Sequence, residues 1–235
     1  MAVNAQRLKI VGSKGRTYLG RLLGLFVALF GLFVAAADAA TPGVPIDGRL
    51  QFTVVRDGEP IGTHLFRFAR DADRTTVHVR TDIDYRFLFL PLYRFRHTSK
   101  EVWTGGKLTE LFSRTDDNGE AIRIEAHANG KGLVVKGLDG EYRTGPGVVP
   151  SSLWNADVVR AKELLSTIRG ELLKTDSEFI AEEVLTLNGR QVPTRRYKIT
   201  GEFERNVWYD KGSDVLVRVR FKASDGSQVE YVRKP

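Results

Sequence analysis

The chain has 235 residues, of which 28% are charged, with a formal net charge of +7 and no cysteine. The absence of cysteine excludes a disulfide framework, thiolate catalysis and a cysteine-ligated metal. Basic residues are interleaved with acidic ones and no nucleic-acid-binding motif is present, so the composition argues against a nucleic-acid partner.

The first forty residues predict a secretory signal peptide. Five basic residues lie within the first 21, the apolar segment 22–37 follows, and Ala37-Asp38-Ala39 is a small-residue cleavage site. The apolar segment is short for a bilayer span and contains Gly24 and Gly31, which favours cleavage near Ala39 over an uncleaved anchor. We therefore expect a periplasmic or secreted protein that meets the membrane only through this segment, before cleavage.

Residues 1–39 account for part of the positive charge. They hold five of the 36 Lys and Arg residues and one of the 29 Asp and Glu residues, so the remainder carries a formal charge of +3. We expect residues 40–235 to form a single β-rich domain, because a chain of this length can bury a core without disulfides.

From Arg49 onward the sequence consists of short alternating segments separated by turn dipeptides. Asn129-Gly130, Asn188-Gly189 and Asp225-Gly226 supply the positive φ that tight hairpin turns require. Period-two alternation between such turns predicts an antiparallel meander with one buried face. Strands are expected near residues 49–56, 61–69, 75–87, 92–104, 107–115, 121–128, 132–137, 168–175, 178–188, 191–202, 204–210, 214–223 and 228–233.

One segment interrupts this pattern. The stiff loop 145–150 leads into residues 156–165, for which a short helix is predicted with Asn155 or Ser152 as its N-cap. The predicted fold is all-β: a large, strongly curved antiparallel meander, partly closed into a half-barrel or roll, with this helix against its concave face. A two-sheet sandwich is the alternative architecture.

Several segments together resemble a family of uncharacterised exported bacterial proteins, domain of unknown function 6134. The segments are residues 55–64, 93–95, 101–108, 113–119 and 150–155. The C-terminal stretches 207–210 and 216–219 resemble a second uncharacterised exported family. The resemblance implies a periplasmic β-rich domain and supplies no activity, cofactor or catalytic residue.

Two of the four histidines are candidate catalytic residues. Counting by twos, His64 and His97 each share a strand face with aromatic residues, so the two imidazoles could meet on the concave side with Asp84 or Glu101 nearby. Weak acid–base candidates are therefore His64, His97 and Glu101. The alternative is that each imidazole is simply hydrogen-bonded within an aromatic cluster. No close-spaced ligand pair such as HExxH exists, so neither a metal nor a cofactor is expected.

The apolar run 87–95 is the most distinctive part of the chain. It could line a cleft for a hydrophobic ligand, with Arg86, Arg94 and Arg96 at the mouth, or form a strand covered on both faces. The candidate ligand-binding residues are Phe89, Leu92, Tyr93, Phe95, Trp103 and Trp154.

These observations favour a non-enzymatic role. The expected partner is a lipid or another hydrophobic or amphiphilic small molecule, or a protein of the cell envelope, held in the concave face. The alternative is a periplasmic hydrolase or isomerase that uses His64 and His97.

Overall fold

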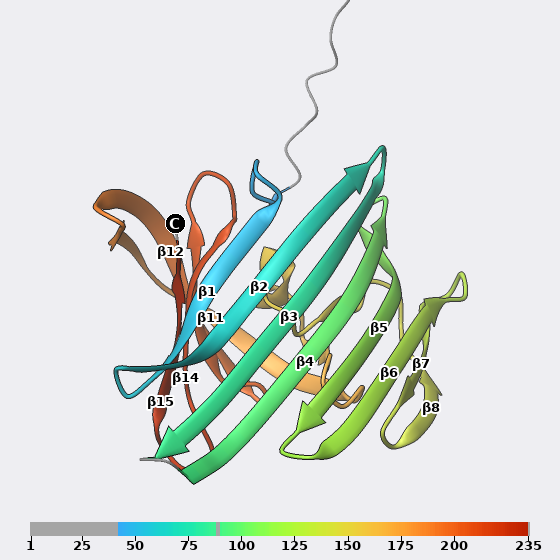
Figure 1. Ribbon diagram of the computed structural model, residues 1–235. Helices are drawn as coiled ribbons and strands as arrows, with labels where there is room; N and C mark the ends of the chain where they lie inside the picture. The colour runs from blue at the N-terminus through green and yellow to red at the C-terminus, as the bar shows by residue number, and fades with distance from the viewer. Residues whose placement is uncertain (1–41, 88–89, 235) are drawn as a thin grey trace, which may run out of the picture. The chain divides into compact units, whose positions relative to one another are not determined.

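The computed structural model describes residues 42–87 and 90–234, so the predicted signal segment lies outside the described residues. The described residues form one sheet of fifteen strands, in the spatial order β8-β7-β6-β5-β4-β3-β2-β1-β15-β14-β13-β12-β11-β10-β9 (Figure 1). Within these ranges, no helix is long and apolar enough to cross a lipid bilayer. The strands are β1 (Arg49–Arg56), β2 (Glu59–Asp71), β3 (Arg74–Phe87), β4 (Leu90–Thr104), β5 (Lys107–Asp117), β6 (Glu120–Ala128), β7 (Leu133–Gly137), β8 (Gly140–Arg143), β9 (Val149–Pro150), β10 (Glu163–Leu165), β11 (Leu172–Leu187), β12 (Arg190–Gly201), β13 (Arg205–Asp210), β14 (Leu216–Lys222) and β15 (Gln228–Arg233).

The two ends of the described chain join the sheet into one surface. β15 pairs antiparallel with β1, with Val54 opposite Tyr231, so one meander of β1–β8 and another of β9–β15 share a continuous ladder. All neighbouring strands are antiparallel except β9 and β10, which are parallel. The single curved sheet confirms the predicted all-β roll; the two-sheet sandwich is wrong.

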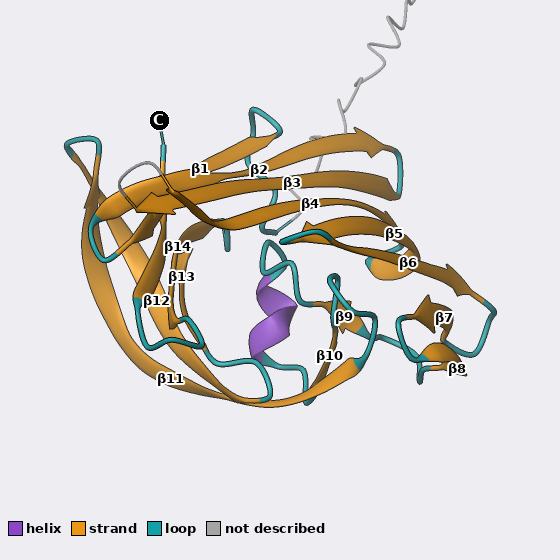
Figure 2. Cartoon of the chain, turned by 60° about the horizontal axis from the view of Figure 1, so that its bottom comes forward, coloured by secondary structure: helices purple, strands orange, loops and turns teal. Residues whose placement is uncertain are grey.

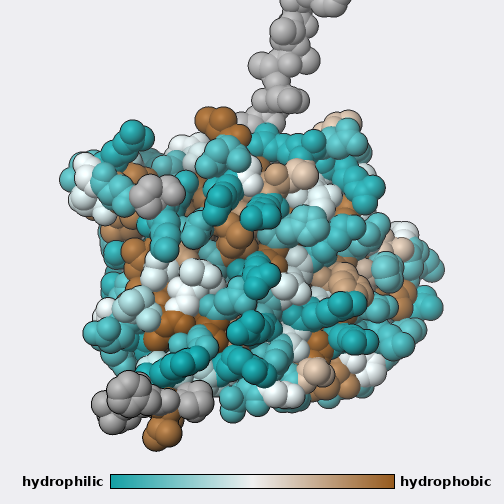
Figure 3. Space-filling model, in the orientation of Figure 1, coloured by the Kyte–Doolittle hydropathy of each residue, from teal (hydrophilic) through white to brown (hydrophobic). Residues whose placement is uncertain are grey.

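The alternation of side chains places the hydrophobic core on the concave face. In β6, Ile122, Ile124 and Ala126 are buried and each is flanked by exposed residues. The strands curve around the interior (Figure 2), whereas hydrophilic residues predominate on the outer face seen in Figure 3. Curvature therefore converts a one-sided apolar sheet into an enclosed core.

The predicted helix over residues 156–165 is wrong in extent and type. The structure has one 3₁₀ turn, η1 (Ala156–Val159), capped by Asn155, whose Oδ1 accepts a hydrogen bond from the Asp157 N–H at 2.9 Å. Leu164 and Leu165 are fully buried and belong to β10, paired with β11. Two adjacent buried leucines suit a strand covered on both faces, and this tertiary burial overrides the weak helical pattern.

The strand boundaries differ from the prediction in the second half of the chain. The predicted strands 168–175 and 178–188 are one strand, β11, whose register with β12 shifts between Phe179 and Ala181. The short strands β8, β9 and β10 were not predicted, because two to four residues are too few to show a period of two.

A segment that we call the strap, residues 151–173, crosses the concave side and contains η1 and β10 (Figure 2). It is hydrogen-bonded to the opposite part of the sheet. Ser113 Oγ donates to the Thr167 carbonyl at 2.7 Å, and Tyr142 Oη donates to the Gly170 carbonyl at 2.6 Å. The Leu138 N–H donates to the Arg169 carbonyl at 3.0 Å. Among the described residues, these hydrogen bonds, and not strand pairing, join the strap to β5, β8 and the turn between β7 and β8.

The strap approaches β7 at a pair of glycines. Gly170 has a φ of +82°, and a Cβ on it would lie 2.8 Å from the Cα of Gly137 and 2.9 Å from Ile124 Cδ1. Only glycine accepts both this backbone conformation and this proximity. The Gly137–Gly170 contact therefore sets how closely the strap can approach the sheet.

We predict that Gly170→Ala destabilises the protein more than Gly189→Ala does. Both positions have a similar positive φ, +82° and +78°, which costs an alanine about 1–2 kcal/mol. A Cβ at Gly189 meets nothing within 4 Å, whereas at Gly170 it collides with backbone and side-chain atoms, which adds about 1–3 kcal/mol. Urea unfolding of both variants measures the difference; equal losses would contradict the close contact.

Candidate functional site

The concave face contains a cavity of about 870 Å³. This volume lies within the range of small-molecule binding sites. Its walls are the inward faces of β1–β4 and β13–β15 on one side and the strap on the other. The lining includes Ile61, His64, Val79, Thr81, Ile83, Tyr85, Leu92, Tyr93, Phe95, His97, Leu153, Ile168, Leu173, Phe203, Arg205, Val219, Phe221, Val229 and Tyr231.

The inward face of β4 shows why the cavity occupies only part of the concave side. Toward the end of this strand, Trp103 packs edge-to-face on Trp154 of the strap, with ring centroids 5.3 Å apart. Toward its beginning, Tyr93 and Phe95 face the cavity instead. The strap thus fills one half of the concave face with its own side chains and roofs the other half.

His64 and His97 both line the cavity. They lie in one row across the sheet, with Thr81 of β3 directly between them and Thr115 of β5 beyond His97. His64 Nδ1 contacts Thr81 Oγ1 at 2.7 Å, and His97 Nδ1 contacts Thr115 Oγ1 at 2.9 Å. Within the described residues, neither Nε2 has a hydrogen-bond partner, which leaves both for a ligand.

Burial determines the charge of this pair. It lowers the pKa of His64 from 6.5 to about 3, with the proximity of His97 as a smaller cause, and it lowers the pKa of His97 to about 4. Both imidazoles are therefore neutral at pH 7 and can exchange hydrogen bonds with a ligand.

The carboxylates expected near these histidines lie elsewhere. Asp84 is exposed and pairs with Arg86 at 3.0 Å, away from the cavity lining. Glu101 is four residues beyond His97 on the same face of β4, about 13 Å along the strand. The site thus brings together His64 and His97 but no carboxylate that orients either ring.

Glu101 has a different environment. It is fully buried, and its Oε2 accepts hydrogen bonds from Trp103 Nε1 at 3.0 Å and from Trp154 Nε1 at 2.8 Å. Burial raises the pKa of Glu101 above its ordinary value, although the hydrogen bonds from Trp154, Ser152 and Trp103 oppose the shift. Since Trp154 belongs to the strap, this carboxyl group ties the strap to β4.

The predicted ligand-binding residues divide into two groups. Leu92, Tyr93 and Phe95 line the cavity, whereas Trp103 and Trp154 lie in the core beside Glu101. The sixth, Phe89, lies outside the described residues.

The arginines expected at the mouth are not in the lining. Arg94 is exposed and pairs with Asp116 at 2.9 Å, and Arg86 and Arg96 are also exposed. Sequence reasoning missed the contribution of the C-terminal part of the chain, which supplies Phe203 from the β12–β13 turn and Arg205, Phe221 and Tyr231 from β13, β14 and β15. The alternation of apolar and polar residues in β14 and β15 shows which face of each strand is apolar. Only the pairing of β15 with β1 brings that face to the cavity.

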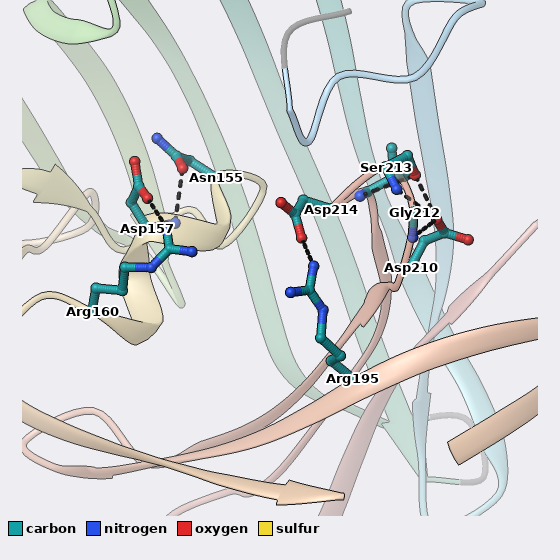
Figure 4. A network of polar contacts seen from close by, with 9 residues as sticks. Asn155, Asp157, Arg160, Arg195, Asp210, Gly212, Ser213 and Asp214 are labelled. Carbon is teal, nitrogen blue, oxygen red and sulfur yellow. Dashed lines mark hydrogen bonds and ion pairs between the residues drawn. The ribbon is translucent and has the colours of Figure 1, made fainter. Parts of the chain in front are cut away.

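A separate polar network surrounds η1 and the turn after β13 (Figure 4). Asp210 Oδ1 accepts hydrogen bonds from the Gly212 and Ser213 N–H groups at 3.0 and 2.8 Å, and Arg195 pairs with Asp214. These groups satisfy one another and stabilise the turn. Among the described residues, no cluster of three or more His, Asp or Glu side chains is arranged to hold a metal ion.

The roll is similar to a solved structure described as a β-barrel-like protein of domain of unknown function DUF1849 from Brucella abortus. The two share 12% identity with a TM-score of 0.55, over 79% of this chain and 96% of that chain. At this identity the likeness shows the fold alone.

The chain belongs to the family described as Domain of unknown function (DUF6134), which matches residues 52–234. This match confirms the resemblance found in the sequence. No curated protein matches the chain.

We predict that the two buried histidines weaken the fold as the pH falls. Their pKa values in the folded protein lie below the 6.5 of an unfolded histidine, so the unfolded chain binds protons first. Each histidine should lower the free energy of unfolding by about 1.4 kcal/mol per pH unit between about pH 6.5 and 4.5. His64→Asn and His97→Asn keep a polar atom near Thr81 and Thr115, respectively. In urea unfolding at pH 7 and 4.5, each variant should show a smaller change of the free energy of unfolding with pH than the wild type. The exposed His127→Asn should leave this pH dependence unchanged; a wild-type slope in His64→Asn would contradict the burial.

We predict that Glu101→Gln and Glu101→Ala differ sharply. Because the pKa of Glu101 is raised on folding, the stability that its protonated form provides is lost as the pH rises above about 4.5. Gln imitates the protonated form, so Glu101→Gln should be at least as stable as the wild type at pH 8. Ala leaves two indole N–H groups unpaired and a void, a loss of about 3 kcal/mol or more. Urea unfolding at pH 5 and 8 tests this; equal damage in both variants would refute it.

Proposed function

We propose that this protein is an exported, non-enzymatic binding protein that holds a hydrophobic or amphiphilic small molecule in the cavity beneath the strap. The observation that carries the proposal is the cavity of about 870 Å³, about half of whose lining residues are aliphatic or aromatic. Binding sites for small molecules combine apolar walls with convergent polar groups, and a lining that mixes both suits an amphiphilic ligand. His64, His97 and Thr81 supply such groups on one wall.

The position of the cavity also supports a binding role. The turns β1–β2, β12–β13 and β14–β15 contribute to its lining or lie directly beside it, so its mouth faces the ends of the strands. A periplasmic location is part of the proposal and follows from the predicted cleavage near Ala39.

A hydrolase or isomerase that uses His64 and His97 is the second candidate, because both imidazoles line the cavity. A histidine base is usually oriented by a carboxylate, and the described residues place none beside either ring. The binding role therefore accounts for more of the site.

We predict that the neutral fluorescent probe N-phenyl-1-naphthylamine binds the protein and that Ile83→Trp weakens this binding by about tenfold or more. Ile83 is half-buried and lines the cavity, so the larger ring occupies ligand volume. The control is Val184→Trp, at a side chain that is 61% exposed and outside the lining. Fluorescence titration gives the affinities, and thermal unfolding checks that each variant folds.

Two results would contradict the proposal. One is an absence of probe binding to the folded wild-type protein. The other is equal affinity in Ile83→Trp and Val184→Trp, which would place the probe outside the cavity.

A further inference from the structure

Arg205 is a cation that lies among aromatic side chains of the cavity lining. It begins β13, lines the cavity and is partly buried. Its guanidinium carbon lies 4.3 Å from the ring centroid of Phe203 and 3.9 Å from that of Phe221. Two aromatic rings therefore stack on the guanidinium, an arrangement that favours arginine over lysine.

Stacking leaves only the edge of the guanidinium for hydrogen bonding. Nη1 donates to the neighbouring Glu204 carbonyl at 2.6 Å. The remaining N–H groups lie in the guanidinium plane, where a planar fork matches the oxygens of a carboxylate or phosphate. Within the described residues, Arg205 has no ion-pair partner.

The other two cations that line the cavity are already paired. Arg56 forms an ion pair with Asp225 and stacks on the Tyr85 ring at 4.4 Å. Arg169 lies 3.8 Å from Glu120. Of the three cationic lining residues, Arg205 is thus the one whose charge is not matched by a carboxylate in the described part of the chain.

Three of the four lining carboxylates accept hydrogen bonds. Asp225 belongs to the pair with Arg56, Asp117 accepts the Tyr93 hydroxyl at 2.8 Å, and Glu202 accepts the Lys174 N–H at 2.7 Å.

The fourth lining carboxylate, Glu171, has its Oε2 buried without a hydrogen-bond partner among the described residues. Burial is the main cause that raises the pKa of Tyr142 to about 12, and the charge of Glu171 is the second. The charged neighbours of Arg205 are instead Glu204 and the ionisable hydroxyl of Tyr231. None of the four lining carboxylates forms an ion pair with Arg205 among the described residues.

The surroundings of Arg205 match the two parts of an amphiphile. Phe221 and Val219 of β14 and Tyr231 of β15 continue the lining from Arg205 as an apolar wall. Arg205 follows the β12–β13 turn, so it lies at the end of the strands, where a polar head group can remain near solvent. The apolar wall then offers a path for a hydrocarbon chain.

We propose that the ligand of the cavity is a single-chain amphiphile with an anionic carboxylate or phosphate head group, and that Arg205 binds this head group. This inference rests on the function proposed above and adds the ligand class and the residue that selects it. The guanidinium, stacked on the Phe203 and Phe221 rings, supplies charge and a planar fork, while the apolar part of the wall holds the chain.

The test is displacement of N-phenyl-1-naphthylamine by four compounds that each carry a ten-carbon chain: decanoate, decyl phosphate, decanol and decyltrimethylammonium. At low salt, either anion should bind the wild-type protein at least about tenfold more tightly than the cation. Arg205→Gln should lower the affinity for both anions by about tenfold or more and change that for decanol less than about twofold. The tighter of the two anions identifies the head group.

Arg94→Gln is the matched control, because Arg94 is exposed, is paired with Asp116 and lies outside the cavity lining. It should leave the affinities for all four compounds within about twofold of the wild type. A measurement on the unaltered chain stands beside the variants: raising the salt concentration should weaken decanoate binding and not decanol binding. This comparison remains decisive even where Arg205→Gln fails to fold.

The outcomes separate the two proposals. If decanol and decyltrimethylammonium bind as tightly as the anions, without salt dependence, the head-group assignment is wrong and cavity binding stands. The assignment is equally wrong if Arg205→Gln folds and loses no anion affinity. If neither the probe nor any of the four compounds binds the folded protein, the proposed function itself fails.

Discussion

The buried carboxyl group of Glu101, hydrogen-bonded to two indoles, is the interaction on which the rest of the structure depends. Trp103 comes from the same strand and Trp154 from the strap, so one oxygen joins the sheet to the segment that crosses it. Tyr209 adds a second anchor, because its hydroxyl donates to the Leu153 carbonyl at 2.8 Å. The Glu101 Oε2 exchanges water for two indole N–H groups, whereas Oε1 has no hydrogen-bond partner among the described residues, and burial accordingly raises the pKa of the carboxyl group. Its geometry therefore fixes where the strap begins its path across the concave face.

That path explains why a folded roll retains an open volume. At the anchored end, the strap supplies Trp154 and Val158 to the core, and the concave face is filled. At the other end the strap turns away to meet β5–β8, with Ser113 and Tyr142 holding its far side. Over this part of the sheet, strap side chains such as Ile168 and Leu173 line the space opposite the strands without filling it, and the cavity is the result. Fold and binding site are thus consequences of one crossing segment.

Much of this fold could be predicted from sequence and the site only in part. Strict alternation such as that of Ile122, Ile124 and Ala126 predicts strands because a period of two is local. The strap could not be predicted, since the contact between Ser113 and Thr167 joins residues 54 positions apart. The meeting of His64 and His97 was predictable from their shared apolar faces. The place of Arg205 was not, because its strand reaches the cavity only through the pairing of β15 with β1.

The central claim is that the strap roofs a ligand cavity. Among the described residues, Arg205 is the one cation of its lining that has no carboxylate partner. A crystal structure of the protein grown with decanoate tests this most directly. The account predicts continuous density for the acyl chain between β4 and β14, with the carboxylate at the edge of the Arg205 guanidinium. A structure in which side chains of the strap and of β4 fill this volume, with decanoate absent or bound on the outer surface, would contradict it.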